Sequence, residues 1–151
     1  MSLVYLGLGT NLGDKNQNLN DAVMELSLEV GCVVSLSAFY TSEPWGFNSE
    51  HVFLNAVVLM ETSLSPVQVL LKTQMIEKKL GRTGKSVTDY EDRLIDIDIL
   101  LYDMLIIENP SLKIPHPLIT KRNFVLIPLV EIAPDLVDPV SGKKYREYIQ
   151  K

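Results

Sequence analysis

The sequence predicts an α+β fold, on the evidence of its composition, its apolar periodicity and the order of its segments. The 151 residues are 46% hydrophobic and 22% charged, which suits one compact domain over residues 1–151. Strand-like and helix-like patterns follow one another as strand, helix, strand, strand, helix, strand, before a C-terminal extension. This order predicts a ferredoxin-like βαββαβ sheet with its helices on one face, plus a C-terminal hairpin and helix.

The first half of the chain contains three predicted strands and one helix. Residues 4–9 predict a short buried strand, and the turn after it leads into residues 15–29, whose apolar positions recur at helical spacing. β-Branched and aromatic residues predict strands over 32–41 and 52–61. The segment between them, 42–51, is longer than a hairpin requires and carries aromatic side chains, so it predicts a binding loop.

The second half begins with the clearest helix signal. Ser65 is a good N-cap, Pro66 suits a first turn, and an apolar stripe then continues to Gly81. Residues 82–91 are polar and aperiodic, and they predict a mobile loop that acts as a lid over a neighbouring site. The remaining predicted elements are a strand within 92–102, a small hairpin over 105–114 and a helix over 122–132.

Asp96 and Asp98 place two carboxylates in a run that otherwise has the pattern of a buried strand. Successive strand side chains point to opposite faces, so the two aspartates share one face. Adjacent anions require a cation, and magnesium, which binds one or two carboxylates together with substrate phosphates, is the simplest candidate. Arg93 adds a guanidinium near the same face. Aspartate pairs also occur on solvated edge strands, but the apolar residues around this pair favour a metal or phosphate site.

Composition excludes several classes of protein. A net charge of −5 argues against a general nucleic-acid binder, and no apolar run approaches the ~20 residues that span a bilayer. Cys32 is the single cysteine, so a disulfide framework is excluded, a cytoplasmic location is expected, and the thiol is predicted to be a small core residue. The pattern Gly7-x-Gly9-x-x-x-Gly13 could bind a phosphate at the start of the following helix, but it lacks the lysine and the spacing of a P-loop. A tight turn is the favoured interpretation.

Four polar residues stand out from the apolar pattern around them or from their neighbours in the chain. Asn55, inside an apolar strand, is either a satisfied core group or a group that hydrogen-bonds a ligand. Gln74 and Glu77 lie one helical turn apart and, on their pattern alone, predict an ordinary exposed helix face. His116 stands between two prolines, which predicts a rigidly held imidazole.

With these residues assembled, the chain strongly resembles the 6-hydroxymethyl-7,8-dihydropterin pyrophosphokinases of folate biosynthesis over nearly its whole length. The motifs that carry the resemblance are Leu8-Gly9-Thr10-Asn11-Leu12-Gly13, Thr41-Ser42-Glu43-Pro44-Trp45-Gly46, Phe53-Leu54-Asn55-Ala56, Gln74-x-x-Glu77 with Gly81-Arg82, Arg93-x-x-Asp96-x-Asp98, and Pro115-His116 with Arg122-x-Phe124. Each motif is moderately specific, and their order and spacing together are highly specific.

The resemblance implies a role for each matching position. Asp96 and Asp98 would bind two magnesium ions between the ATP phosphates and the pterin hydroxymethyl oxygen, and with Arg82 and Arg93 they are the implied catalytic residues. The implied ATP contacts are Gln74, Glu77, Arg82, Lys85, Arg93, Ile99, His116 and Arg122. The implied pterin contacts are Ser42, Pro44, Trp45, Phe53, Asn55, Asp96 and Phe124.

One loop departs from the family pattern. Members often carry a tryptophan and several arginines before the aspartate pair, whereas residues 85–93 here include acidic side chains. Lys85 is the only cation between Arg82 and Arg93, so it is expected to provide part of the phosphate contact. As a point charge it lacks the bidentate geometry of arginine.

The implied reaction transfers pyrophosphate from ATP to the pterin alcohol and releases AMP. Two metal ions and a ring of arginines that align the reactants can supply most of the catalysis. Two alternatives stay open: a nucleotidyltransferase, in which a glycine-rich turn and an Asp-x-Asp pair lie closer together than Gly9 and Asp96 do, and a ferredoxin-like ligand-binding module without activity. ATP and the dihydropterin are the expected partners of a monomer that contacts no nucleic acid or membrane.

Overall fold

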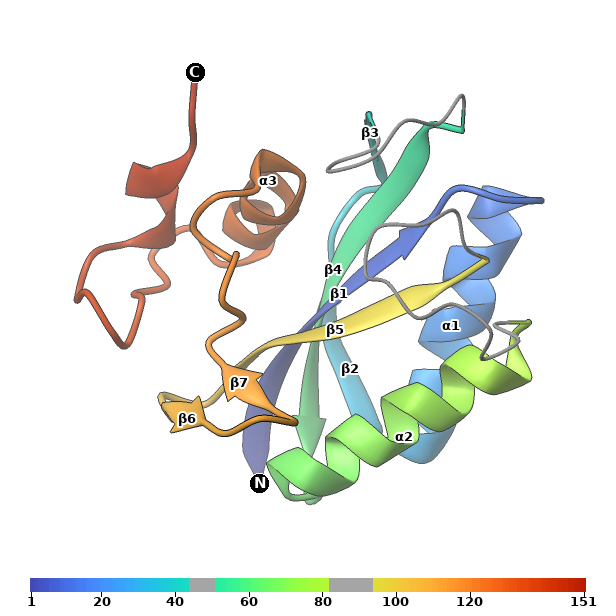
Figure 1. Ribbon diagram of the computed structural model, residues 1–151, viewed down its shortest axis with the longest axis horizontal. Helices are drawn as coiled ribbons and strands as arrows, with labels where there is room; N and C mark the ends of the chain where they lie inside the picture. The colour runs from blue at the N-terminus through green and yellow to red at the C-terminus, as the bar shows by residue number, and fades with distance from the viewer. Residues whose placement is uncertain (44–50, 82–93) are drawn as a thin grey trace.

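The computed structural model describes residues 1–43, 51–81 and 94–151, and Figure 1 shows how its elements are arranged. Within these ranges the elements are β1 (Ser2–Thr10), α1 (Lys15–Glu29), β2 (Gly31–Leu36), β3 (Tyr40–Ser42), β4 (Phe53–Thr62), α2 (Pro66–Lys79), β5 (Asp96–Tyr102), β6 (Ile107–Glu108), β7 (Lys113–Ile114), α3 (Asn123–Ile132) and a short 3₁₀ helix, η1 (Tyr145–Tyr148).

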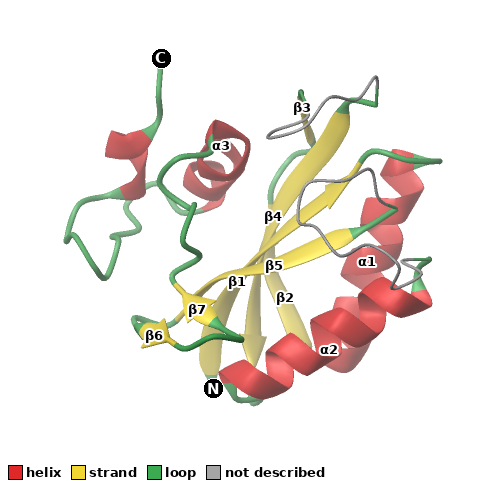
Figure 2. Cartoon of the chain, in the orientation of Figure 1, coloured by secondary structure: helices red, strands yellow, loops and turns green. Residues whose placement is uncertain are grey.

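A single larger sheet forms the centre of the described structure (Figure 2). Its strands run in the order β2-β4-β1-β5, β3 also pairs with β4, and all these neighbours are antiparallel. Helices α1 and α2 cover one face, while α3 and η1 pack on the other (Figure 1). The predicted α+β class, with an antiparallel sheet and three helices, is therefore confirmed. The predicted small hairpin is present as β6 and β7.

Local signals start the two helices of the first face. Asp14 caps α1, its side chain accepting a first-turn backbone N–H at 3.1 Å, and α1 has the predicted bounds. Ser65 and Gln68 form a reciprocal capping box at the start of α2. After α1 the chain turns directly into β2, and only glycine fits at Gly31, because a Cβ there would lie 2.0 Å from the Glu61 carbonyl oxygen.

Strand alternation divides the apolar side chains between two cores. The helix-side core contains residues of β1, β4 and β5 with α1 and α2, among them Leu6, Leu8, Leu19, Leu26, Val58, Met60, Val69, Ile76, Ile97 and Ile99. The opposite core joins the same strands to α3 and η1, through Tyr5, Val57, Leu59, Leu100, Leu101, Val125, Leu126, Leu129 and Tyr145. No helix in the described ranges is long and apolar enough to cross a membrane.

The predicted strand over 32–41 is wrong as a single element, because the structure divides it into β2 and β3. Between them the Ala38 backbone N–H leaves the sheet and donates to both carboxylate oxygens of Glu131 on α3, at 3.1 Å each. Ser37 stays with β4, since its hydroxyl accepts the Val57 N–H at 2.9 Å. A side chain 93 residues away along the sequence therefore ends β2.

The prediction that Cys32 is a core residue is also wrong, because its side chain is exposed. Cys32 pairs with Glu61, which pairs with Leu3, so these three residues form one row across the sheet. The row lies on the face opposite α1 and α2, and Leu3 is itself 42% exposed. Edge position and an uncovered part of the face together leave the thiol in solvent.

Candidate active site

Asp96 and Asp98 stand at the start of β5, on the sheet face opposite α1 and α2. Ile97 and Ile99 alternate with them, are 5% and 6% exposed, and belong to the helix-side core. The predicted alternation is confirmed: the two carboxylates share one face, and both side chains remain partly exposed. β1, the first strand along the chain, pairs with β5 so that Asp96 lies opposite Gly9 and Asp98 opposite Gly7. The expectation that the glycine-rich turn and the aspartate pair are widely separated is therefore wrong, because Gly9 and Asp96 are neighbours on adjacent strands.

The two carboxylates are close enough to perturb each other. The pKa of Asp98 is raised well above its usual range, chiefly because the surrounding protein excludes water from the charged form, and then because of the charge of Asp96 and a hydrogen bond with it. The Arg122 guanidinium opposes this rise, whereas Glu77 adds to it. The negative charges around Asp98 therefore disfavour its charged form, and a bound cation would relieve this repulsion.

Hard oxygen donors of this kind suit magnesium. Over residues 1–43, 51–81 and 94–151, no three His, Cys, Asp or Glu side chains lie close enough to hold a metal ion by themselves. Magnesium is commonly bound by one or two carboxylates, with substrate phosphates and water in the other positions. Asp96 and Asp98 fit this mode, in which the substrate completes the coordination.

His116 approaches the aspartate pair from the segment after β7. Its backbone N–H donates to the Leu100 carbonyl oxygen at 3.0 Å, and its ring Nδ1 accepts the Leu118 backbone N–H at 3.1 Å. Because Nδ1 is an acceptor, the proton of the neutral ring lies on Nε2. Nε2 is 4.0 Å from Asp98 Oδ2, so the imidazole presents its N–H toward the carboxylate pair. The predicted rigid placement of His116 agrees with these three contacts.

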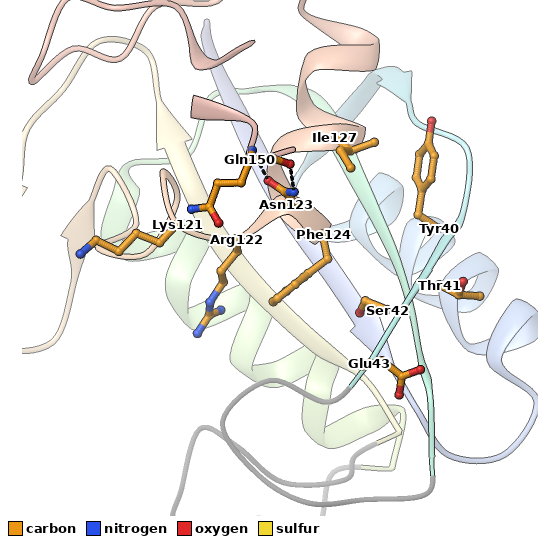
Figure 3. A pocket seen from close by; sticks show the side chains of 10 residues that line it. All are labelled: Tyr40, Thr41, Ser42, Glu43, Lys121, Arg122, Asn123, Phe124, Ile127 and Gln150. Atoms are coloured by element: carbon orange, nitrogen blue, oxygen red, sulfur yellow. Dashed lines mark hydrogen bonds between the residues drawn. The ribbon is translucent and has the colours of Figure 1, made fainter. Parts of the chain in front are cut away.

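Arg122 and Phe124 lie at the start of α3, above the same sheet face. The Arg122 Cζ is 5.4 Å from the centre of the Phe124 ring, within cation–π range. Both residues line a cavity of about 360 Å³ between β3 and the start of α3, and Figure 3 shows the Phe124 ring between Arg122 and Ser42. The residues that line this cavity are Tyr40, Thr41, Ser42, Glu43, Lys121, Arg122, Asn123, Phe124, Ile127 and Gln150.

Asn55 is only 5% exposed, and it lies beside this cavity on β4. Its Nδ2 donates to the Ser42 hydroxyl at 2.7 Å and to the Tyr40 carbonyl oxygen at 3.3 Å, across the β3–β4 pairing. Among the described residues, none donates a hydrogen bond to its Oδ1. Asn55 is thus partly a satisfied core group, and its carbonyl oxygen remains available to a ligand. Phe53 lies two residues earlier on the same strand face, paired with Ser42.

The prediction from pattern alone that Gln74 and Glu77 share an exposed face is wrong for Glu77. Gln74 is exposed, but Glu77 is 6% exposed and its Oε2 accepts the Ile97 backbone N–H at 2.8 Å. Since β5 is the last strand of the sheet, this carboxylate covers its open edge. Backbone direction alternates along a strand, so the Ile99 N–H and carbonyl point to the same open edge as the Ile97 N–H.

Several predicted site residues lie outside the described ranges. They are Pro44 and Trp45 of the binding loop, and Arg82, Lys85 and Arg93 of the predicted lid and its end. The lid over 82–91 falls wholly in this segment. Their roles stay predictions.

The structure also places residues near the site for which the sequence analysis assigned no site role. The predicted tight turn is present at Gly13, whose φ is +69°. The prediction is wrong for Gly9, which lies within β1. Alternation along β1 could have placed Gly9 on the aspartate face. Asn123 exchanges two hydrogen bonds with the Gln150 backbone, at 2.7 and 2.9 Å, and both residues line the cavity. No local pattern could have revealed that pairing.

The chain is similar to known proteins of one family. A family model described as 7,8-dihydro-6-hydroxymethylpterin-pyrophosphokinase matches residues 5–134. The 2-amino-4-hydroxy-6-hydroxymethyldihydropteridine pyrophosphokinase of Porphyromonas gingivalis is 49% identical over 136 residues, which cover 89% of this chain and 92% of that protein. The protein of the same name from Aquifex aeolicus is 41% identical over 148 residues, or 98% of this chain and 91% of that protein.

Some matches are to longer proteins. A folic acid synthesis protein of Pneumocystis carinii is 43% identical over 148 residues, which cover 98% of this chain but 20% of that protein. Among solved structures, the wild-type HPPK-DHPS protein of Plasmodium falciparum with pteroate aligns with a TM-score of 0.79. The alignment covers 98% of this chain and 44% of that one at 14% identity, so it supports the fold alone.

Proposed function

Because the chain belongs to the 7,8-dihydro-6-hydroxymethylpterin-pyrophosphokinase family, we propose that it transfers pyrophosphate from ATP to the hydroxymethyl group of 6-hydroxymethyl-7,8-dihydropterin and releases AMP. We also propose a ferredoxin-like classification for its sheet. The strand order β2-β4-β1-β5, with α1 and α2 on one face, supports that classification.

The observation that carries the proposed reaction is a single row across three paired strands. Asp96 on β5 is opposite Gly9 on β1, and Gly9 is opposite Asn55 on β4, so all three share one face. A metal-binding carboxylate and a hydrogen-bonding amide thus stand at the two ends of one surface. A substrate with a polar ring edge and a reactive alcohol can lie between them.

The pterin end of the proposed site consists of Asn55, Ser42, Phe53 and Phe124, with Pro44 and Trp45 as further contacts. The Asn55 Oδ1 can accept hydrogen bonds from the amino group of the ring. The Phe53 and Phe124 rings supply aromatic surface on the same side of the sheet, and stacking of this kind orients a flat heterocycle. Asp96 lies where the hydroxymethyl arm would reach the metal site.

The phosphate end consists of Asp96 and Asp98 with His116 and Arg122. The aspartates would hold two magnesium ions, and the His116 Nε2–H and the Arg122 guanidinium would donate hydrogen bonds to phosphate oxygens. Arg82, Lys85 and Arg93 are proposed to complete this set. The proposed nucleotide contacts are the exposed Gln74, the buried Glu77 and the backbone of Ile99. The position of β5 at the end of the described sheet supports that place for the base.

Transfer at this site requires alignment rather than covalent help from the protein. The pterin alcohol oxygen bonds to the β-phosphorus, the bond from that phosphorus to the oxygen bridging the α-phosphate breaks, the hydroxyl proton is lost, and AMP departs with the bridging oxygen. Magnesium, when bound, supplies neutralisation of the transferring phosphate charge. Phe124 and Asn55 hold the alcohol in line, and His116 and Arg122 fix the phosphates.

Identification of the nucleotide product tests this proposal. The purified protein is incubated with ATP, magnesium and the pterin alcohol, and the nucleotides are separated by chromatography. AMP formed in equal amount to consumed pterin is the expected result. ADP as product would indicate a simple kinase, and ATP binding without any turnover would indicate a binding module.

A further inference from the structure

Strand β1 carries glycine at two successive positions of the active-site face, Gly7 and Gly9. Gly7 is opposite Asp98, and Gly9 is opposite Asp96 on one side and Asn55 on the other. Glycine within a strand weakens it, because the unfolded chain has more freedom to lose and the folded strand has no side chain to pack. Neither glycine has a positive φ, so backbone conformation does not require glycine at either position.

The two positions differ in what a side chain would touch. A Cβ at Gly7 would meet only the Leu100 side chain, at 3.4 to 3.6 Å, among its nearest atoms. A Cβ at Gly9 would meet Asn55 Oδ1 at 3.4 Å and Phe53 Cδ1 at 3.8 Å. Both sets of distances are ordinary van der Waals contacts, so the fold itself has room for alanine at either position. At Gly9 the added methyl would occupy space beside two residues of the proposed pterin site.

The Asn55 carbonyl oxygen provides a second, independent indication that a ligand occupies this space. Asn55 is 5% exposed, its amide nitrogen donates to Ser42 and Tyr40, and no residue within 1–43, 51–81 or 94–151 donates a hydrogen bond to its Oδ1. The Oδ1 is not among the buried polar atoms that lack a partner, so it keeps access to solvent and can accept a hydrogen bond from a ligand. The Oδ1 lies next to the space above Gly9, where a ligand donor can reach it.

From this geometry we infer that Gly9 is a specificity-determining position, whose missing side chain forms the floor on which the flat pterin ring lies between Asn55 and Asp96. The inference rests on the proposed function and adds a residue to it. Asn55 and Asp96 are two strand spacings apart, about 9.5 Å between backbones, and Gly9 lies midway. A fused two-ring heterocycle with a hydroxymethyl arm can bridge such a gap only if nothing rises from the middle strand.

The substitution Gly9→Ala should therefore weaken pterin binding without lowering the stability of the fold. A glycine-to-alanine change at a compatible backbone conformation reduces the freedom of the unfolded chain, so Gly9→Ala should unfold at the same temperature as the wild type or a higher one. The methyl would lift the ring away from Asn55 and Phe53. Overpacking of this kind predicts that the Kd for the pterin rises about tenfold or more.

The experiment compares the wild type, Gly9→Ala and the matched control Gly7→Ala. Each protein is examined by thermal unfolding, by calorimetric binding of ATP with magnesium and of the pterin alcohol, and by AMP release. We expect Gly9→Ala to keep its melting temperature and its ATP affinity within about twofold while losing about tenfold in pterin affinity. Gly7→Ala should keep its pterin affinity within about threefold, because its methyl touches Leu100 alone.

Each contrary outcome has one meaning. If Gly9→Ala bound the pterin as tightly as the wild type, or lost ATP affinity equally, the inference would be wrong and the proposed function would stand. A lowered melting temperature in Gly9→Ala with equal losses for both ligands would identify Gly9 as a structural residue. If the wild type itself neither bound nor converted the pterin, the proposed function and the role of Gly9 in pterin binding would both be wrong.

Discussion

Replacement of Glu77 by alanine should destabilise the ligand-free protein, because this carboxylate covers the open edge of β5. Glu77 is 6% exposed and accepts the backbone N–H of Ile97, which is itself 5% exposed, at 2.8 Å. Hydrogen bonds to a charged group contribute about 1.5–3 kcal/mol, and the alanine variant leaves the N–H buried without its acceptor. The N–H that loses its acceptor belongs to Ile97, the residue between Asp96 and Asp98.

A second effect acts in the opposite direction. The Glu77 charge raises the pKa of Asp98, which means that the Glu77 and Asp98 carboxylates repel each other in the folded protein. Removal of the charge relieves this repulsion, so the net loss for Glu77→Ala should be about 1–2 kcal/mol. For a domain of this size that corresponds to a melting temperature lowered by about 2–8 °C.

The variant Glu77→Gln separates the two effects. Glutamine keeps an oxygen that can accept the Ile97 N–H, but it removes the charge that repels Asp98. Its unfolding free energy should equal or exceed that of the wild type, while Glu77→Ala falls below both. Urea unfolding at neutral pH without magnesium or ATP measures the three values. Equal losses for the glutamine and alanine variants, or no loss for alanine, would refute the assignment of the Glu77–Ile97 hydrogen bond as a stabilising contact.

Three further predictions concern residues away from β5. Phe124→Ala should weaken pterin binding by about 1–3 kcal/mol with ATP affinity nearly unchanged, and equal calorimetric losses for both ligands would show that the ring only supports the fold. Cys32→Ser should change the unfolding free energy by less than about 0.5 kcal/mol, because the thiol is exposed, and a larger loss in urea unfolding would contradict that position. The pKa of Tyr40 is raised chiefly by its hydrogen bond to Glu131, at 2.6 Å, so Glu131→Gln should lower it, and an unchanged ultraviolet titration of the phenols would contradict this contact.

Much of the fold could be predicted because local chemistry determines it. The helix over Lys15–Glu29 has the predicted bounds, since a capping aspartate begins it and a glycine that nothing larger can replace follows it. The alternation around Asp96 and Asp98 could likewise be predicted from the sequence, because burial of the neighbouring isoleucines in the core is favourable and leaves the aspartates on the other face. In these elements, capping residues, glycines and apolar alternation determine where the element begins, where it ends and which face is buried.

Other features depended on contacts between distant segments and could not be predicted. Glu131 on α3 divides one predicted strand into two by capturing the Ala38 N–H. Glu77 is buried where the edge of β5 presents the Ile97 backbone N–H to α2. Cys32 is exposed because α3 covers the other part of its face. Each of these outcomes follows from the packing of elements, which the local pattern does not contain.

The most direct test of the central claim is the rate of AMP formation by Asp96→Asn and Asp98→Asn in the presence of magnesium, ATP and the pterin alcohol. Asparagine keeps the size of each side chain and removes the charge that would hold the metal. We expect each variant to stay folded and to lose at least about a hundredfold in turnover, since the neutralisation of phosphate charge is worth several kcal/mol. Either variant retaining more than a few per cent of the wild-type rate would contradict the assignment of this carboxylate pair as the metal site.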